Sequence, residues 1–130
     1  MGARSGTETL QAKAAMKQYE IWWASLPPPV GRRPVLLLSR DSAYAVLNKL
    51  IVAEVTSTVR DIPVEVSLGR REGLKTRSVA NFDNVHVVAR SDLAAKIGVL
   101  SVSRVREVKR ALGYALDRPE LKYADRENLT

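Results

Sequence analysis

The sequence predicts an α+β fold, a small and strongly curved β-barrel followed by a C-terminal α-helix. Five short stretches with the composition of β-strands come first, and turns containing proline or glycine separate them. A stretch with a clear helical stripe follows near the end of the chain. At 130 residues, the chain is long enough for one domain with a small core.

The predicted strands are short and rich in apolar, aromatic or β-branched residues. They span residues 20–24, 35–39, 50–59, 64–68 and 78–89. The second is wholly apolar apart from its last residue, which is typical of a strand buried on both faces. The fourth alternates, with Val64, Val66 and Leu68 on one face.

The fifth predicted strand is interrupted by the run Asn81-Phe82-Asp83-Asn84. Asparagine and aspartate disfavour strands, so this run needs a structural or functional reason. One interpretation is a turn or a bulge. The other is a group of amides and a carboxylate that reads the edges of nucleic-acid bases. The residues alone favour neither.

Two helices are predicted after the strands. The first is short, covers residues 91–97, and would end at Gly98. Ser101 is the candidate N-cap of a longer helix that runs to about residue 117. Its apolar stripe consists of Val105, Val108, Leu112, Ala115 and Leu116. Its other faces carry basic residues that we interpret mainly as a solvated surface: Arg104, Arg106, Lys109 and Arg110.

The chain divides into one domain and two flanking segments. Residues 1–18 have no strong apolar face and are expected to be an N-terminal extension, disordered or with a short helix over residues 7–16. Residues 19–117 carry all the predicted strands and both later helices. Residues 118–130 are expected to be a polar C-terminal tail.

The positive charge belongs to the predicted domain. The formal net charge is +7, and the sequence pI is about 10.1. The first 18 residues contribute +2 and the last 14 contribute −1, so residues 19–116 carry +6. A basic compact domain attracts polyanions, and such binding weakens with salt.

Several classes of chemistry are excluded by the residues present. The chain has no cysteine, and its single histidine, His86, excludes a His-rich metal site. The acidic residues are scattered, which disfavours a two-metal nuclease centre. We therefore expect no metal and no cofactor. No apolar run approaches a membrane span or the core of a signal peptide, and we expect a cytoplasmic protein.

Metal-free strand cleavage favours RNA as the polyanion, because RNA carries its own nucleophile, the 2′-hydroxyl next to each phosphate. The stretch Arg32-Arg33-Pro34 places a guanidinium at the mouth of the predicted sheet, after a loop that Pro27, Pro28 and Pro29 stiffen. The planar guanidinium fork matches two phosphate oxygens. One arginine with a hydroxyl donor can align and stabilise such a reaction.

The ordered motifs resemble those of the MazF/PemK-type toxin endoribonucleases. The matching segments, in chain order, are YEIWWASL (19–26), RPVLLLS (33–39), IVAEVTS (51–57), IPVEVSLG (62–69), GL (73–74), SVANFDN (78–84) and LAAKIGVLS (93–101). No single motif is strong, but the set in this order is specific. The resemblance covers about residues 19–117.

The resemblance implies an SH3-like antiparallel barrel, a homodimer, and the toxin of a type II toxin–antitoxin system. It implies a metal-independent, sequence-selective endoribonuclease that cleaves single-stranded RNA, leaves a 2′,3′-cyclic phosphate, and inhibits translation and growth. It also implies a cognate antitoxin whose acidic C-terminal segment folds into the basic groove. Two alternatives stay open: a non-catalytic binder on the same barrel, such as a gyrase inhibitor, and a nucleic-acid adaptor that binds through the terminal helix.

The resemblance also assigns roles to residues at the strand ends. Arg33, directly before the proline, corresponds to the family arginine that activates and stabilises the reacting phosphate. Thr56 corresponds to the strand-end threonine that donates a hydrogen bond to that phosphate. Arg32 and Ser57 are neighbouring candidates for RNA binding. The loop at residues 27–32 is shorter than in many members and lacks an acid, which bears on the cut-site preference.

The polar run of the fifth strand completes the candidate set. Asp83 and Asn84 match an acidic-then-amide pair that some members use on substrate bases or as a proton acceptor. Asn81 stands where one branch has a basic residue, and it is a candidate for RNA binding. Arginine is a poor general base. Asp83 is therefore the leading candidate for the base.

Overall fold

The computed structural model describes residues 15–122, which form a six-stranded antiparallel sheet and a helical C-terminal segment. The strands are β1 (Glu20–Ser25), β2 (Arg32–Leu37), β3 (Lys49–Thr56), β4 (Glu65–Leu68), β5 (Ser78–Ala89) and β6 (Leu93–Val99). The helices are α2 (Val105–Ala115) and α3 (Pro119–Lys122). The strand order is β4-β5-β3-β2-β1-β6.

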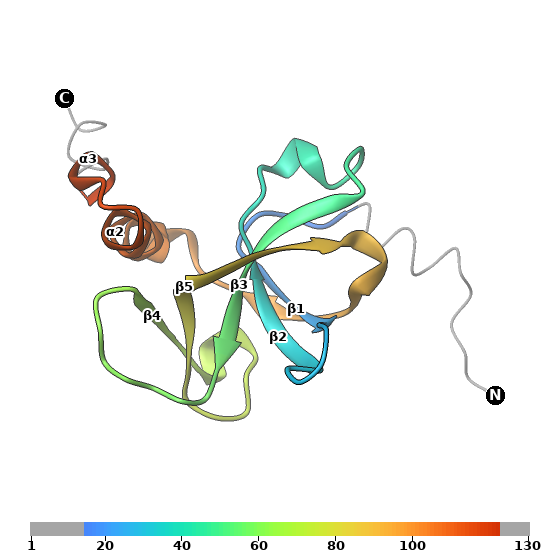
Figure 1. The fold of residues 1–130 in the computed structure, drawn as a ribbon, viewed down its shortest axis with the longest axis horizontal. Helices are drawn as coiled ribbons and strands as arrows, with labels where there is room; N and C mark the ends of the chain where they lie inside the picture. Colours follow the sequence, from blue (N-terminus) through green and yellow to red (C-terminus); the bar gives the residue numbers. More distant parts are fainter. Residues whose placement is uncertain (1–14, 123–130) are drawn as a thin grey trace.

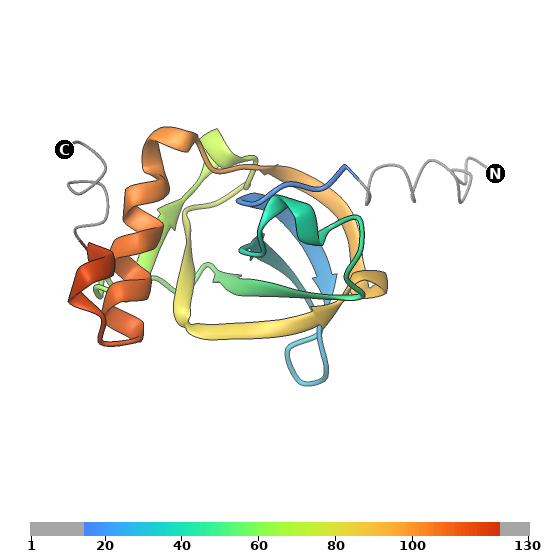
Figure 2. The same cartoon turned by 90° about the horizontal axis from the view of Figure 1, so that it is seen from above.

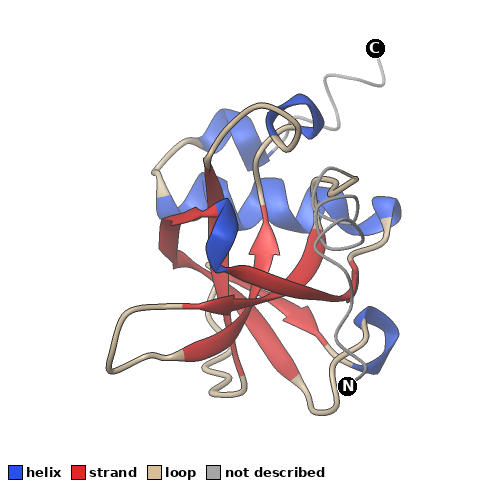
Figure 3. Ribbon diagram, turned by 90° about the vertical axis from the view of Figure 1, so that its right-hand side faces the viewer, coloured by secondary structure: helices blue, strands red, loops and turns tan. Residues whose placement is uncertain are grey.

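The sheet curls into a half-barrel, as the sequence predicts. Figure 1 and Figure 2 show the strands wrapping around a common interior, with α2 and α3 together at one side. Figure 3 shows α2 lying along the curled sheet. No helix within residues 15–122 is long and apolar enough to cross a lipid bilayer. Residues 7–14 of the helix considered for residues 7–16 lie outside the described residues.

The five predicted strands are confirmed, with shifts at their ends. β5 has the predicted bounds, Ser78–Ala89. β2 begins three residues earlier than predicted, at Arg32, because Arg32, Arg33 and Pro34 all have partners on β1. β3 ends at Thr56 rather than at residue 59.

The short helix predicted over residues 91–97 is wrong, since this segment forms the sixth strand. Residues 90–92 make a 3₁₀ turn, and Leu93–Val99 then pairs with β1. The pair of alanines at 94 and 95 favours a helix locally. Pairing along β1, from Leu93 opposite Ala24 to Val99 opposite Glu20, overrides that preference.

The hydrophobic core has two clusters, because the central strands β1 and β2 are buried on both faces. Adjacent residues of β2 belong to different clusters, with Leu36 in one and Val35 and Leu37 in the other. Val108 and Ala111 of α2 cover the cluster that contains Leu36. The wholly apolar composition of this strand correctly indicates burial on both faces.

The edge strand β6 packs against the turn that follows β4. A 3₁₀ turn over residues 70–72 leads into Gly73, which has a φ of +93°. A Cβ built on Gly98 of β6 would lie 1.9 Å from the carbonyl oxygen of Glu72. The backbones therefore approach more closely than any side chain allows, and Gly98 permits the curled sheet to close at this point.

The basic residue Arg104 is a structural ion-pair partner and not part of a solvated surface. Ser101 accepts a hydrogen bond from the Ser103 N–H, and a 3₁₀ turn then leads into α2. Arg104 donates to the carbonyl of Ser67 and forms ion pairs with Glu72 and Glu107. Its side chain is 25% exposed, so the solvated-face prediction is wrong for this residue. Arg106 and Arg110 are exposed, as predicted.

The Arg104–Glu107 pair should make stability depend on pH. The hydrogen bond from Arg104 holds the pKa of Glu107 below its ordinary value of 4.5. Because the folded state then binds the proton less readily than the unfolded state, this stabilisation is complete above pH 4.5 and lost as pH falls through the lowered value. Glu107→Gln should cost about 0.5 kcal/mol at pH 7, a size typical of a partly exposed pair.

Urea unfolding of the wild type and of Glu107→Gln at pH 7 and pH 3 tests this expectation. The difference between their midpoints should shrink at the lower pH. Glu120→Gln, at an exposed position of α3, is the matched control for removing one negative charge. A difference that is equal at both pH values would contradict the assignment.

Candidate functional site

The β1–β2 hairpin presents two arginines at the start of β2. Its loop closes on itself, since the Leu26 N–H donates to the Gly31 carbonyl and the Val30 N–H donates to the Pro27 carbonyl. Gly31 has a φ of +68°, which favours glycine. β2 then begins with Arg32 opposite Ser25 and Arg33 opposite Ala24. The loop therefore fixes where both guanidinium groups leave the backbone.

Arg33 and Thr56 lie on the neighbouring strands β2 and β3, just beyond the last paired residues. The β2–β3 register pairs Val35 with Glu54, and continuing it by two residues places Arg33 opposite Thr56. Pro34 separates Arg33 from Val35 on β2. Because proline has no N–H to donate to the ladder, the regular pairing ends at Val35. Residues that face each other across an antiparallel pair point to the same side of the sheet. The two residues predicted to be catalytic are thus brought together.

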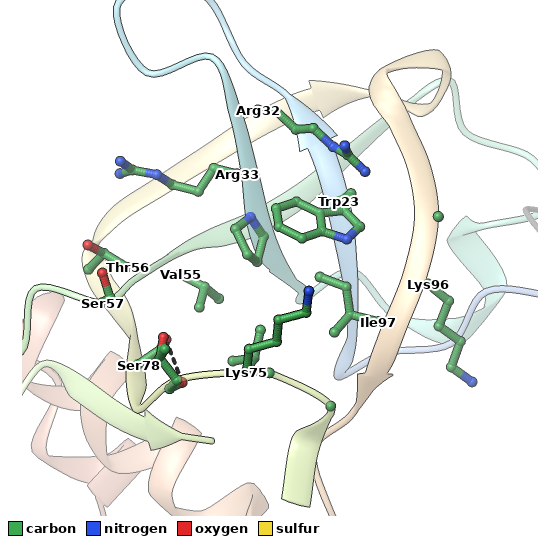
Figure 4. Close-up of a pocket in the computed structure, with 15 residues that line it drawn as sticks. Trp23, Arg32, Arg33, Val55, Thr56, Ser57, Lys75, Ser78, Lys96 and Ile97 are labelled. Atoms are coloured by element: carbon green, nitrogen blue, oxygen red, sulfur yellow. Dashed lines mark hydrogen bonds between the residues drawn. The ribbon is translucent and has the colours of Figure 1, made fainter. Parts of the chain in front are cut away.

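A pocket of about 660 Å³ opens at these strand ends. It lies among β1, β2, β3, the segment before β5, and β6 (Figure 4). Its cationic lining residues are Arg32, Arg33, Lys75 and Lys96. Its hydroxyl-bearing lining residues are Thr56, Ser57, Thr76 and Ser78. No carboxylate lines it within residues 15–122, so the pocket suits an anion.

Arg32 and Arg33 occupy different sides of this pocket. Figure 4 shows Arg33 beside Thr56 and Ser57, and Arg32 beside Trp23. The Arg32 guanidinium carbon lies 4.5 Å from the centre of the Trp23 ring, a cation–π contact. The structure therefore brings Arg32, Arg33, Thr56 and Ser57 to one pocket, as predicted. Sequence reasoning had not assigned Trp23, Lys75 or Lys96 to the site.

Arg33 is held by a buried carboxylate that sequence reasoning missed. Its Nη1 donates to Oε1 of Glu54 at 2.8 Å, and the Glu54 side chain is only 8% exposed. The second carboxylate oxygen of Glu54 contacts Nε2 of His86 on β5. The available signal was the acid itself, which interrupts the otherwise apolar run LIVAEV. A charge in such a strand needs a partner.

The polar run of β5 forms a bulge, which confirms one of the two interpretations. The β3–β5 register pairs Ala53 with Val85 but Glu54 with Asn81, so residues 82–84 have no partner on β3. The Asn81 side-chain oxygen accepts a hydrogen bond from the Asp83 N–H at 2.8 Å. Asn81 is buried, whereas Asp83 and Asn84 are exposed. None of the three lines the pocket, and their contact with RNA stays a prediction.

Residues 17–116 match the sequence pattern of a family described as the PemK-like, MazF-like toxin of type II toxin–antitoxin systems. The chain is 37% identical over 99 residues to the probable endoribonuclease MazF5 of Mycobacterium tuberculosis, with 75% of this chain and 90% of that protein covered. It is 36% identical over 85 residues to endoribonuclease MazF3 of the same species, covering 65% and 82%.

Solved structures share the fold. The Mycobacterium tuberculosis toxin MazF-mt6 superimposes with a TM-score of 0.71 at 35% identity, with 75% of this chain and 96% of that chain covered. A mycobacterial endoribonuclease in complex with its cognate antitoxin gives a TM-score of 0.69 at 23% identity, covering 79% and 96%. At that identity, the second likeness concerns the fold alone.

Proposed function

Since this chain belongs to the PemK-like, MazF-like toxins of type II toxin–antitoxin systems, we propose that it is a toxin endoribonuclease that cleaves single-stranded RNA without a metal ion. The observation that carries this proposal is that Arg33 and Thr56 line one basic pocket, which no carboxylate of the described residues lines. A scissile phosphate between these side chains would meet a fixed positive charge and a hydroxyl donor.

The proposed reaction is an internal transesterification. The 2′-oxygen attacks the adjacent phosphorus, forms the O2′–P bond and loses its proton, while the P–O5′ bond breaks and the 5′-oxygen gains a proton. The products are a 2′,3′-cyclic phosphate and a 5′-hydroxyl. Arg33 would stabilise the negative charge that develops on the phosphorane oxygens, and Thr56 would donate a hydrogen bond to one of them.

The remaining candidates are proposed to hold the RNA around that phosphate. Arg32 and Ser57 line the pocket and would contact the backbone on either side of the cut. Asn81, Asp83 and Asn84 belong to the β5 bulge, beyond the pocket, and would meet bases of an RNA that extends past it. Asp83 is exposed there but does not line the pocket, which argues against it as the acceptor of the 2′-hydroxyl proton of a phosphate bound between Arg33 and Thr56.

Two protein partners are proposed. An antitoxin with an acidic segment would neutralise the cationic pocket and exclude RNA from it, and a structural neighbour of this fold is described with its cognate antitoxin. A second copy of the chain would form a homodimer. Exposed apolar side chains support self-association, because Ile51 and Val87 face each other across β3 and β5 and remain open to solvent. The proposed location is the cytoplasm.

Incubation of a long, unstructured RNA with the protein in EDTA tests the proposed function. We expect discrete cuts, each with a cyclic-phosphate end and a 5′-hydroxyl end, and mapping of the ends would give the recognised sequence. An RNA that stays intact but binds with a steep dependence on salt would refute the nuclease proposal. It would support the non-catalytic binder in its place.

A further inference from the structure

We propose that Glu54 and His86 are positioning residues for Arg33, and that protonated His86 neutralises Glu54 and so makes the Arg33 charge available to the RNA phosphate. This inference rests on the proposed endoribonuclease function. It concerns the buried carboxylate of Glu54, which contacts both Arg33 and His86. Arg33 lines the pocket described above, called the catalytic pocket in this proposal, and His86 lines a second pocket.

The geometry of Glu54 makes it the link between the other two groups. Oε1 accepts from Arg33 Nη1 at 2.8 Å, and Oε2 contacts His86 Nε2. Glu54 lines a pocket of about 380 Å³ together with His86, whereas Arg33 lines the catalytic pocket. The side chain of Arg33 is 35% exposed and that of His86 is 43% exposed. Arg33 and His86 therefore each reach solvent through a different pocket, whereas the Glu54 side chain that both contact is nearly buried.

The bulge in β5 creates this contact. When the ladder is followed along β3, His86 is paired with Val52, two residues before Glu54. Residues 82–84 have no partner on β3, and the ladder resumes with Asn81 opposite Glu54. Asn81 holds the bulge through its hydrogen bond from the Asp83 N–H. The imidazole and the carboxylate thus meet diagonally across the two strands.

Charge balance gives the contact a consequence for catalysis. With neutral His86, Arg33 and Glu54 sum to zero, and the carboxylate both competes with the phosphate for the guanidinium and repels it. With protonated His86, the three groups sum to +1. The phosphorane carries more negative charge than the phosphate. The cluster with protonated His86 therefore stabilises the phosphorane more than the cluster with neutral His86 does. Burial of Glu54 strengthens this effect, because water screens the pairs poorly there.

The surroundings of His86 contain one further ionisable group. Besides Glu54, the second pocket is lined by Asp92 from the turn before β6, by Ser25 and by apolar residues. Asp92 lines the same pocket as His86 and is therefore the charged group to vary as a control. Histidine ordinarily titrates near neutral pH, and His86 is the only histidine in the sequence.

A double-mutant cycle with an uncleavable ligand tests the proposal. The proteins are the wild type, Glu54→Gln, His86→Gln and the double variant. The ligand is a single-stranded oligonucleotide with 2′-deoxy sugars throughout, which lacks the nucleophile and therefore binds without cleavage or proton transfer. Its Kd is measured from pH 5.5 to pH 8.5 at constant salt, and kcat is measured on the all-RNA substrate over the same range.

We expect the wild type to bind about tenfold more tightly at pH 5.5 than at pH 8.5, and His86→Gln to lose this dependence. In the Glu54→Gln background, His86→Gln should change Kd by less than about twofold, because no buried charge remains to neutralise. Asp92→Asn is the matched control and should keep the wild-type pH dependence. The melting temperatures of all variants are compared with that of the wild type, to identify any variant whose Kd changes because it is less well folded.

Two outcomes would overturn the inference. One is the same pH dependence of Kd in His86→Gln as in the wild type. The other is an equal effect of His86→Gln on Kd with and without Glu54, which is what two uncoupled residues predict. If the wild type binds the ligand with the expected pH dependence but never cleaves RNA, the nuclease proposal fails and the positioning of Arg33 stands.

Discussion

Replacing Arg33 with alanine should reduce the rate of RNA cleavage about a hundredfold or more. The Arg33 guanidinium lines the pocket with Thr56, and alanine removes the planar cation proposed to stabilise the phosphorane. Arg33→Lys should recover little of the loss, because an ammonium group cannot make the planar, two-pronged contact. The measurement is the initial cleavage rate of a fluorescent RNA in EDTA, at saturating RNA.

Two controls separate the chemistry from the fold. Arg77→Ala removes an exposed arginine whose ion pair with Asp61 is largely solvated, and it should retain nearly full activity. Arg33→Ala leaves Glu54 buried with His86 as its remaining partner, which destabilises the protein. The double variant Arg33→Ala/Glu54→Gln removes that buried charge and should be stable yet inactive. Activity in this double variant would contradict the role of Arg33.

Gly98→Ala should unfold the protein or destabilise it by about 3 kcal/mol or more. The new Cβ would lie 1.9 Å from the Glu72 carbonyl oxygen and 2.7 Å from its carbonyl carbon. Backbone atoms cannot move aside as a flexible side chain can, so β6 and the turn after β4 must separate. Because β6 carries Lys96 and Ile97, the pocket that Arg33 and Thr56 line would lose one wall.

Gly69→Ala is the matched control for Gly98→Ala. It lies one residue before the same 3₁₀ turn, its φ is −165°, and a Cβ there meets nothing within 4 Å. It should therefore leave the urea midpoint nearly unchanged. Equilibrium unfolding of the three proteins, followed by tryptophan fluorescence, compares them directly. Equal midpoints for Gly98→Ala and the wild type would show that the two backbones do not meet as described.

Local patterns were enough to predict the strands around the site. The resemblance to a known family, and not the local pattern, assigned Arg33 and Thr56 to one site, and both line the same pocket. The sixth strand could not be predicted in this way, since Leu93–Val99 has a helical composition and becomes a strand only by pairing with β1. Tertiary pairing decides where local preference is weak.

The Arg33–Glu54–His86 cluster was beyond local patterns for a different reason. Asn81 and Asp83 were compatible with a bulge without favouring one, and the size of a bulge was not evident in the sequence. Residues 82–84, which have no partner on β3, shift the β3–β5 register and thereby decide which β5 side chain reaches Glu54. A one-residue bulge would have put another residue in that place. For this reason, the contact between His86 and Glu54 could not be predicted from the sequence.

The strand order of the sheet has a consequence for the time at which the protein becomes active during synthesis. β1, the first strand made, lies between β2 and β6, and β6 is the last strand made. Until β6 has left the ribosome, one edge of β1 is unpaired and the pocket lacks Lys96 and Ile97. Contacts between segments so far apart in sequence form late. A nascent chain would thus lack a complete pocket until β6 has been made and has paired with β1.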